Sequence, residues 1–265
     1  TGRVLEDRDR PVAGAWVLFG QFLVGDGSRL QASSVTANMQ EGKVAAWSGP
    51  DGHFELAGVG SHGGIVVAEH DRMGRSLPVS IAEGTRDVAV DLVVREAAVI
   101  TGTVRVNGKP AAGVLVEAHP KETKSQQFMV RTDPEGRYRF ARVAPGEHVL
   151  AAQAADPVMG GPRHTRAVTV EPHERAVVDF DIETGDVELS LVVSGKDGAR
   201  VDGAWICLIR GRVHADTWGE MRRLTGGTGR IVQTTVYWSP APPRKLTGVI
   251  PGEHTLCAVP VTGDQ

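Results

Sequence analysis

The sequence has few cysteines, few aromatic residues and no long hydrophobic run. Of its 265 residues, two are cysteines and 5% are aromatic. Two cysteines exclude a small scaffold held by several disulfides, and no apolar run approaches the roughly 18 residues of a membrane span. The chain does not begin with a signal-peptide pattern. We therefore expect a mature protein or an excised fragment without a transmembrane segment in this chain.

The sequence also has no excess of positive charge. Its formal net charge is −3 at pH 7. Nucleic acids and anionic membranes are bound through clusters of Lys and Arg, which give such domains a basic balance. We therefore expect no nucleic acid among the partners.

Recognisable catalytic and metal-binding motifs are missing. There is no G-x-S-x-G nucleophile elbow, no H-x-H or H-x-x-x-H pair and no D-x-D-x-D-G loop. Gly58 to Gly63 matches G-x-G-x-x-G, but a strand pattern at 64–68 follows it, where a phosphate-binding loop needs a helix. We expect no catalytic residues, no metal and no cofactor.

Glycine and proline, in contrast, are abundant, at 33 and 15 residues. This balance is typical of many short strands joined by tight turns. The clearest example is the segment 132–152. Asp133-Pro-Glu-Gly136 predicts a turn that ends on a glycine with positive φ, and the alternation after it, beginning with Tyr138 and Phe140, predicts a half-buried strand. A second turn at 144–147 leads into another strand, so the unit is antiparallel.

This unit recurs along the chain, and repeats determine the fold. Three blocks return in the same order. The first follows an initial strand and aligns 10–19 with 109–118 and 199–208. The second carries the turns and aligns 48–59 with 132–143, and 142–152 with 248–258. The third closes two copies, at 79–92 and 168–180.

The blocks predict three domains, at 1–95, 96–184 and 185–265, each of about seven strands. The first carries an insertion at 25–43. The third is divergent: it has an insertion at 212–221, a Pro-rich loop at 237–243 and no third block. It is therefore expected to be incomplete, or to obtain its last strands from elsewhere.

Together the blocks resemble a known family. The pattern G-x-V…P-x-x-G-V-x-V, T-D-x-x-G-x-Y-x-F and V-x-P-G-x-H-x-L-x-A, complete from Gly102 to Ala152, is similar to the carboxypeptidase regulatory-like domain. The resemblance implies an all-β chain of three tandem prealbumin-like (Ig-like) antiparallel β-sandwich domains, related to Cna-B repeats. It also implies a non-catalytic module of secreted or cell-envelope bacterial proteins. The Lys–Asn isopeptide bond of some Cna-B relatives is not expected, because Asn38 and Asn107 lie on no closing strand.

Aromatic side chains are the candidates for ligand or partner binding. Trp16 and Trp205 occupy one repeat position, on the strand face opposite to Val17 and Ile206. If those aliphatic residues are core, the tryptophans face outward. They then either stack against a sugar or pack against a neighbouring copy or an inserted loop, and we favour packing. The other candidates are in the insertion and Pro-rich loop of the third repeat: Trp218, Tyr237 and Trp238.

Cys207 and Cys257 are both in the third repeat. In the repeat register they correspond to Glu117 and Ala151, on the same side of their strands. A disulfide requires Cα atoms within about 7 Å, and in an oxidising envelope it would stabilise this incomplete repeat by roughly 2–4 kcal/mol. The alternative is two free thiols.

These observations predict a structural or binding module with an extracellular, cell-surface or periplasmic location. Its partners would be a protein or a polysaccharide of the cell envelope. Two alternatives remain, namely the accessory domains of a larger hydrolase or peptidase, and a carbohydrate-binding module.

Overall fold

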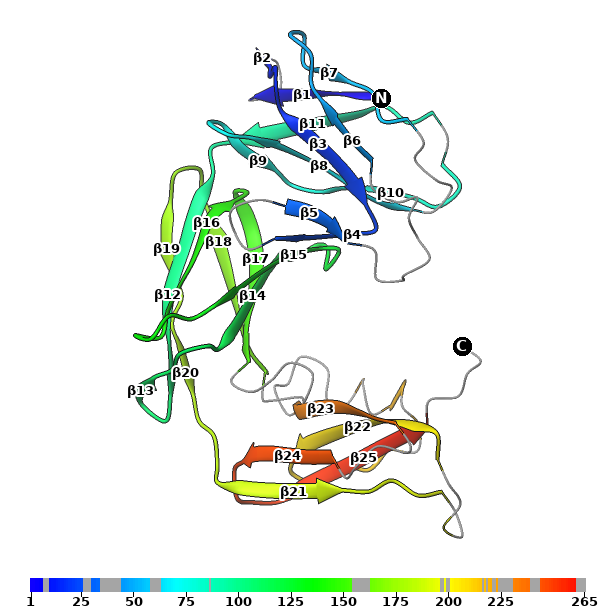
Figure 1. Ribbon diagram of the computed structural model, residues 1–265, viewed down its shortest axis with the longest axis vertical. Coiled ribbons are helices and arrows are strands. Elements are labelled where there is room, and N and C mark those ends of the chain that lie inside the picture. The colour runs from blue at the N-terminus through cyan, green and yellow to red at the C-terminus, as the bar shows by residue number, and fades with distance from the viewer. Residues whose placement is uncertain are drawn as a thin grey trace.

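The computed structural model describes residues 1–6, 10–25, 30–33, 44–57, 63–85, 87–153, 163–195, 198, 201–215, 217, 219–220, 223, 231–238 and 244–260. The fold is all-β (Figure 1), and strands β1 to β25 account for nearly all of its regular structure. Among the residues just given, α-helical ones are confined to 219, 220 and 223, and residue 198 belongs to a 3-10 turn. None of the described helical segments is long and apolar enough to cross a membrane.

The first repeat contributes a nine-stranded sheet and a strand pair that leaves it. Its core consists of ten buried residues, among them Val4, Val17 and Phe54. The sheet order is β2-β1-β11-β9-β8-β3-β6, with β10 on β8 and β7 on β1. The strands are β1 (Gly2–Glu6), β2 (Arg10–Pro11), β3 (Trp16–Gly20), β4 (Phe22–Gly25), β5 (Leu30–Ser33), β6 (Val44–Trp47), β7 (His53–Phe54), β8 (Gly64–His70), β9 (Gly74–Ser76), β10 (Val79–Ile81) and β11 (Val90–Arg95).

The second repeat consists of two sheets that enclose Ile100, Phe140 and Phe180. One sheet has the order β13-β12-β16, with β19 and β20 on β12, and the other has the order β18-β17-β14-β15-β4-β5. Its strands are β12 (Ala98–Val106), β13 (Lys109–Pro110), β14 (Leu115–Pro120), β15 (Gln126–Arg131), β16 (Arg137–Val143), β17 (Gly146–Gln153), β18 (Arg163–Val170), β19 (Arg175–Val177) and β20 (Phe180–Ile182).

The third repeat lies at the opposite end of the molecule from the first (Figure 1). Its described strands form the sheets β21-β24 and β23-β22-β25. They are β21 (Val187–Leu191), β22 (Gly203–Arg210), β23 (Ile231–Trp238), β24 (Arg244–Val249) and β25 (His254–Pro260).

The turn that the repeat predicts is present in two copies. Gly136 has a φ of 74°, as predicted, and Gly52 in the first repeat has the same value. The Gly136 carbonyl accepts a 2.8 Å hydrogen bond from the Val104 amide, and the Gly52 carbonyl accepts one of the same length from Val4. A side chain at either glycine would collide with the carbonyl oxygen of that same valine. The repeated sequence therefore fixes the same contact between the turn and the first strand in both repeats.

The first strand of each of these two repeats pairs in parallel with the closing segment. β1 pairs with β11, and β12 pairs with β19 and β20. The sandwiches are therefore not purely antiparallel. In the third repeat β21 pairs only with β24 among the residues that the structure describes.

Repeats 1 and 2 are joined through one sheet and one core. Strands β4 and β5 extend the sheet of the second repeat, because β4 pairs in parallel with β15 and places Leu23 beside Gln126. Leu18, Leu23 and Val67, all fully buried, belong to the same hydrophobic cluster as the core of the second repeat. Sequence analysis assigned 25–43 to an insertion without a clear period, and it did not predict that the two repeats are joined.

Candidate functional site

A row of four side chains crosses the sheet of the first repeat towards the second. Register pairs place Trp47 of β6 opposite Trp16 of β3, Trp16 opposite Glu69 of β8, and Glu69 opposite Arg75 of β9. We call these four residues the junction row. Cross-strand neighbours of this kind have Cβ atoms about 4.5–5.5 Å apart, so each side chain can contact the next. One end of the row is buried between the repeats and the other faces solvent.

Arg75 forms the buried end. Its side chain is 1% exposed, and it forms an ion pair with Glu69, which is 5% exposed. Its Nη1 donates a 2.6 Å hydrogen bond to the carbonyl oxygen of Arg142, and the guanidinium lies 4.4 Å from the centre of the Phe128 ring. Burial lowers the pKa of Arg75, and Glu69 opposes that shift. An arginine starts so far above neutrality that it remains charged.

A second arginine connects the repeats in the reverse direction. Arg142 of β16 donates a 2.7 Å hydrogen bond from Nη2 to the carbonyl oxygen of His70, and its Nη1 lies 3.4 Å from the Asp71 carboxylate. Each repeat thus contributes one arginine to the junction. The two guanidiniums and the carboxylates of Glu69 and Asp71 balance each other in charge.

Trp47 forms the exposed end. It is 67% exposed, and its ring stacks on that of Trp16 at 6.3 Å between centroids and 25° between planes. A pocket of about 190 Å³ lies beside the rings, lined by Gly14, both tryptophans, Glu69 and Asp71. The arrangement therefore combines an exposed aromatic surface with two carboxylates.

The outward orientation of the two predicted tryptophans is confirmed. Val17 and Ile206 are 0% and 2% exposed, whereas Trp205 is 50% exposed and Trp16 is half-buried. Trp16 packs partly against the core that repeats 1 and 2 share, as the packing interpretation expects. Trp205 lies between Val236 and Val259 on the flanking strands.

The remaining aromatic candidates are not brought together with this site. Trp218 lies outside the described residues. Tyr237 and Trp238 were placed in a loop, and this is wrong: they end strand β23, opposite Ala204 and Gly203, because β23 continues the ladder with β22. Their side chains are not among those described, so their role as anchors stays a proposal.

The two cysteines are direct cross-strand neighbours. Cys207 of β22 pairs with Cys257 of β25, just as Glu117 pairs with Ala151 in the second repeat, so the repeat register placed them correctly. Both are free thiols. Burial, and then the neighbouring Cys257, raise the pKa of Cys207 to about 11. A thiol in this environment is a weak nucleophile at neutral pH. The two thiols are not joined in this structure, and the formation of a disulfide under oxidising conditions stays a prediction.

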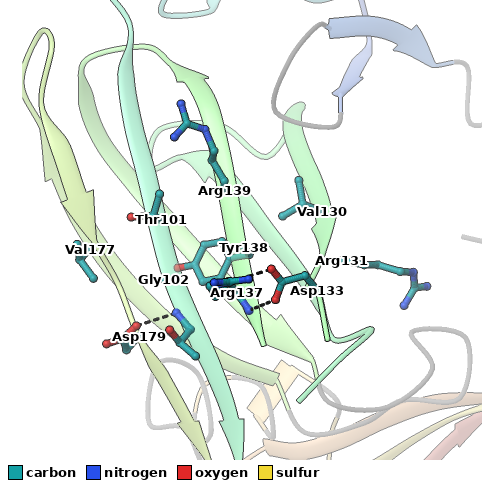
Figure 2. Close-up of a pocket in the computed structure, with 11 residues that line it drawn as sticks. Thr101, Gly102, Val130, Arg131, Asp133, Arg137, Tyr138, Arg139, Val177 and Asp179 are labelled. Atoms are coloured by element: carbon teal, nitrogen blue, oxygen red, sulfur yellow. Dashed lines mark hydrogen bonds and ion pairs between the residues drawn. The ribbon is translucent and has the colours of Figure 1, made fainter. Parts of the chain in front are cut away.

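A larger depression of about 610 Å³ lies on the second repeat and includes Thr101, Asp133, Arg137 and Tyr138 in its lining (Figure 2). The side chain of Arg137 donates to Asp133 at 3.0 Å, and Asp133 also accepts 2.8 Å and 3.1 Å hydrogen bonds from the backbone amides of Arg137 and Glu135. These bonds lower the pKa of Asp133, the Arg137 amide contributing most.

The other polar groups of the depression hold the closing strand. Tyr138 donates to the Val178 carbonyl at 2.6 Å, and Asp179 accepts a 2.7 Å hydrogen bond from the Thr103 amide (Figure 2). None of the lining residues that the structure describes is a serine, cysteine or histidine. Asp133 and Arg137 support the turn, and Tyr138 and Asp179 hold the closing strand.

Sequence reasoning missed Trp47, Glu69, Asp71 and Arg75. The signal that could have found Trp47 is its place one residue before the repeated turn block, on a strand expected to pair with that of Trp16. The other three required the register of β8 and β9, which no repeated motif specifies.

The fold and the junction define a chain of β-sandwich repeats, of which the first two share one sheet and one core. Residues 99–183, within the second repeat, match the model of the carboxypeptidase regulatory-like domain, which is the similarity that the motifs of this repeat predicted. No curated protein gives a significant match.

Three solved structures illustrate the distant similarity. The TIE protein of Bacillus anthracis is 13% identical with a TM-score of 0.32, over 98% of this chain and 42% of that one. A minor pilin of Streptococcus agalactiae is 15% identical with a TM-score of 0.35, over 75% and 98%. The shaft pilin of Lactobacillus rhamnosus is 8% identical with a TM-score of 0.28, over 71% and 96%. The chain thus spans less than half of the Bacillus anthracis protein. At such scores these likenesses support no inference about activity or partners.

Proposed function

We propose that this chain is a non-catalytic tandem β-sandwich module of a secreted or cell-envelope bacterial protein. The observation that supports it most is the joining of repeats 1 and 2 by strands β4 and β5, by one hydrophobic core and by two arginines. A rigid pair of sandwiches suits a spacer that holds a binding surface at a defined position. The domains 1–95, 96–184 and 185–265 are proposed as repeat boundaries on this basis, with β4 and β5 crossing the first.

The proposed partner is a protein or a polysaccharide of the envelope. The exposed ring of Trp47, stacked on the half-buried Trp16, favours this role over that of a passive spacer, because exposed apolar surface can mark a contact site. The anchors proposed in the third repeat, Trp218, Tyr237 and Trp238, belong to the same role. The alternative of accessory domains in a larger hydrolase or peptidase has the same physical basis, and the residues flanking this chain would separate the two.

Two measurements test the proposal. The chain, carried on its full-length protein, should be found by antibody in the culture medium, or be cleaved by added protease on intact cells or on cells with a permeabilised outer membrane, whereas a cytoplasmic marker is protected. The purified chain should show no turnover in a broad hydrolase and peptidase panel. Protection that persists after the outer membrane is permeabilised, or turnover that is lost on substitution of one polar residue of this chain, would contradict the proposal.

A further inference from the structure

The exposed end of the junction row presents an aromatic surface that the fold does not require. Trp47 is 67% exposed on β6, which ends the sheet beside β3. Its ring contacts Trp16, which keeps one indole face in a fixed orientation. Preorganised aromatic surfaces of this kind lose little entropy when a ligand stacks on them.

The charges around the rings favour an uncharged ligand. A pocket of tryptophans and carboxylates would attract a cation if the carboxylates were unbalanced. Here Glu69 is paired with Arg75 and Asp71 lies beside Arg142, so the two negative charges face two positive charges. No net charge remains for an ammonium group, while the carboxylate oxygens can still accept hydrogen bonds.

Asp71 has room for such hydrogen bonds. Its side chain is 85% exposed, and its contact with Arg142 is 3.4 Å long. A carboxylate offers about four lone-pair positions. Hydroxyl donors approaching over Trp47 therefore meet an acceptor at the rim of the pocket.

The pocket volume limits the ligand to about one ring. About 190 Å³ is less than the roughly 300–1,000 Å³ of pockets that take drug-sized molecules. Gly14 forms part of the lining, and a Cβ at this position would meet no atom within 4 Å. The site is thus open on the Gly14 side, where the remainder of a chain could leave it.

We propose that Trp47, Trp16 and Asp71 form a binding site for one ring of an uncharged sugar. This inference rests on the binding role proposed above and names its ligand class. The apolar face of the ring stacks on the indole of Trp47, and its hydroxyl groups donate to Asp71 and to the edge of Glu69. The site lies on the first repeat, beside the contacts that join it to the second.

The test is binding of the whole chain to an array of defined oligosaccharides. The neutral probes are gluco-, manno-, galacto- and N-acetylglucosamine oligomers, and separate sets carry uronates or free amino groups. Binding of a neutral probe is expected, and Trp47→Ala should weaken it at least about tenfold, which corresponds to about 1.4 kcal/mol. Asp71→Asn should weaken it several-fold, since an amide is a poorer acceptor than a carboxylate. Trp47→Phe should retain part of the affinity.

Trp205→Ala is the matched control. Trp205 occupies the corresponding repeat position and is 50% exposed, and its register partners on the two neighbouring strands are Val236 and Val259 rather than a second tryptophan. Its removal should leave affinity unchanged. Both tryptophan variants should melt within a few degrees of the parent because surface changes rarely alter stability.

Three outcomes would overturn the proposal: no neutral probe binds the parent chain, only amino sugars bind, or Trp47→Ala binds as tightly as the parent. Surface exposure on intact cells is measured independently. Failure of the sugar site would therefore be distinguishable from failure of the envelope module.

Discussion

Replacing Arg75 by alanine should destabilise the joined repeats by about 3–5 kcal/mol, the usual cost of breaking a buried ion pair. The side chain is 1% exposed, and its loss leaves the Glu69 carboxylate, 5% exposed, without its cation. The Arg142 carbonyl also loses a 2.6 Å donor, and the Phe128 ring loses the guanidinium above it. Since domains are stable by only about 5–15 kcal/mol, this is a large fraction of the total.

The charge, rather than the volume, should account for most of this loss. The double variant Arg75→Met with Glu69→Gln removes both charges and keeps much of the volume. It should therefore recover most of the stability that Arg75→Ala loses. Arg3→Ala is the control, because Arg3 pairs with Asp91 at 3.2 Å on the surface, with side chains 57% and 51% exposed. An exposed pair of this kind is worth less than about 1 kcal/mol.

Urea unfolding, followed by tryptophan fluorescence, measures the change in the free energy of unfolding. Hydrogen exchange, resolved by peptide, shows which strands lose protection. The shared core predicts that Arg75→Ala lowers exchange protection in β8 of the first repeat and in β15 of the second together. A loss below 1 kcal/mol for Arg75→Ala, or a double variant as unstable as the single one, would refute the reasoning. Loss of protection in one repeat alone would show that the two sandwiches unfold independently.

Three further predictions concern single positions. Gly136→Val and Gly52→Val should each lower the free energy of unfolding by at least about 1–3 kcal/mol, because a Cβ would lie 2.6 Å and 2.5 Å from a backbone oxygen. Gly108→Val is the control: its φ is similar, but its Cβ would meet no atom within 4 Å, so chemical denaturation should show a smaller loss. Oxidation catalysed by a copper complex should join Cys207 to Cys257 within one chain, which intact-mass measurement detects as the loss of two hydrogens. The disulfide should raise the stability of the third repeat by roughly 2–4 kcal/mol. A product linked between chains would contradict this. Burial, followed by repulsion from His119 and Arg75, lowers the pKa of His148, so the folded state binds fewer protons than the unfolded state. Stability should therefore fall as the pH drops below about 6.5, by at most about 1.4 kcal/mol per pH unit for this group. His164 contributes with the same sign, and His148→Phe should flatten the dependence of melting temperature on pH but not abolish it.

Local sequence predicted the turns and the strand faces well because short-range chemistry determines them. The Asp133–Gly136 turn needs a glycine with positive φ, and the same requirement returns at Gly52. Alternation placed Val17 and Ile206 inside and the neighbouring tryptophans outside. Even the pairing of Cys207 with Cys257 followed from the register of the repeat.

The joining of repeats 1 and 2 could not be predicted in the same way. Phe22 to Gly25 is a short apolar segment, and nothing within it specifies that it pairs with β15, about 100 residues later. The pairing depends on the distance and angle between two folded sandwiches. For the same reason, Arg75 resembled an ordinary surface arginine in the sequence, although its burial is caused by the second repeat.

The third repeat shows that the burial of one repeat position depends on the strands that pair beside it. The G-x-V of the first strand returns as Gly2-Arg-Val4, Gly102-Thr-Val104 and Gly185-Asp-Val187. Val4 and Val104 are fully buried, and both strands have a parallel partner, β11 in one case and β19 with β20 in the other. Val187 is half-buried, and among the residues described its strand pairs only with β24. The recurrence of the G-x-V motif therefore does not bury its valine by itself. In the first two repeats the closing strand supplies the remaining burial, and among the residues that the structure describes these two repeats have the larger cores.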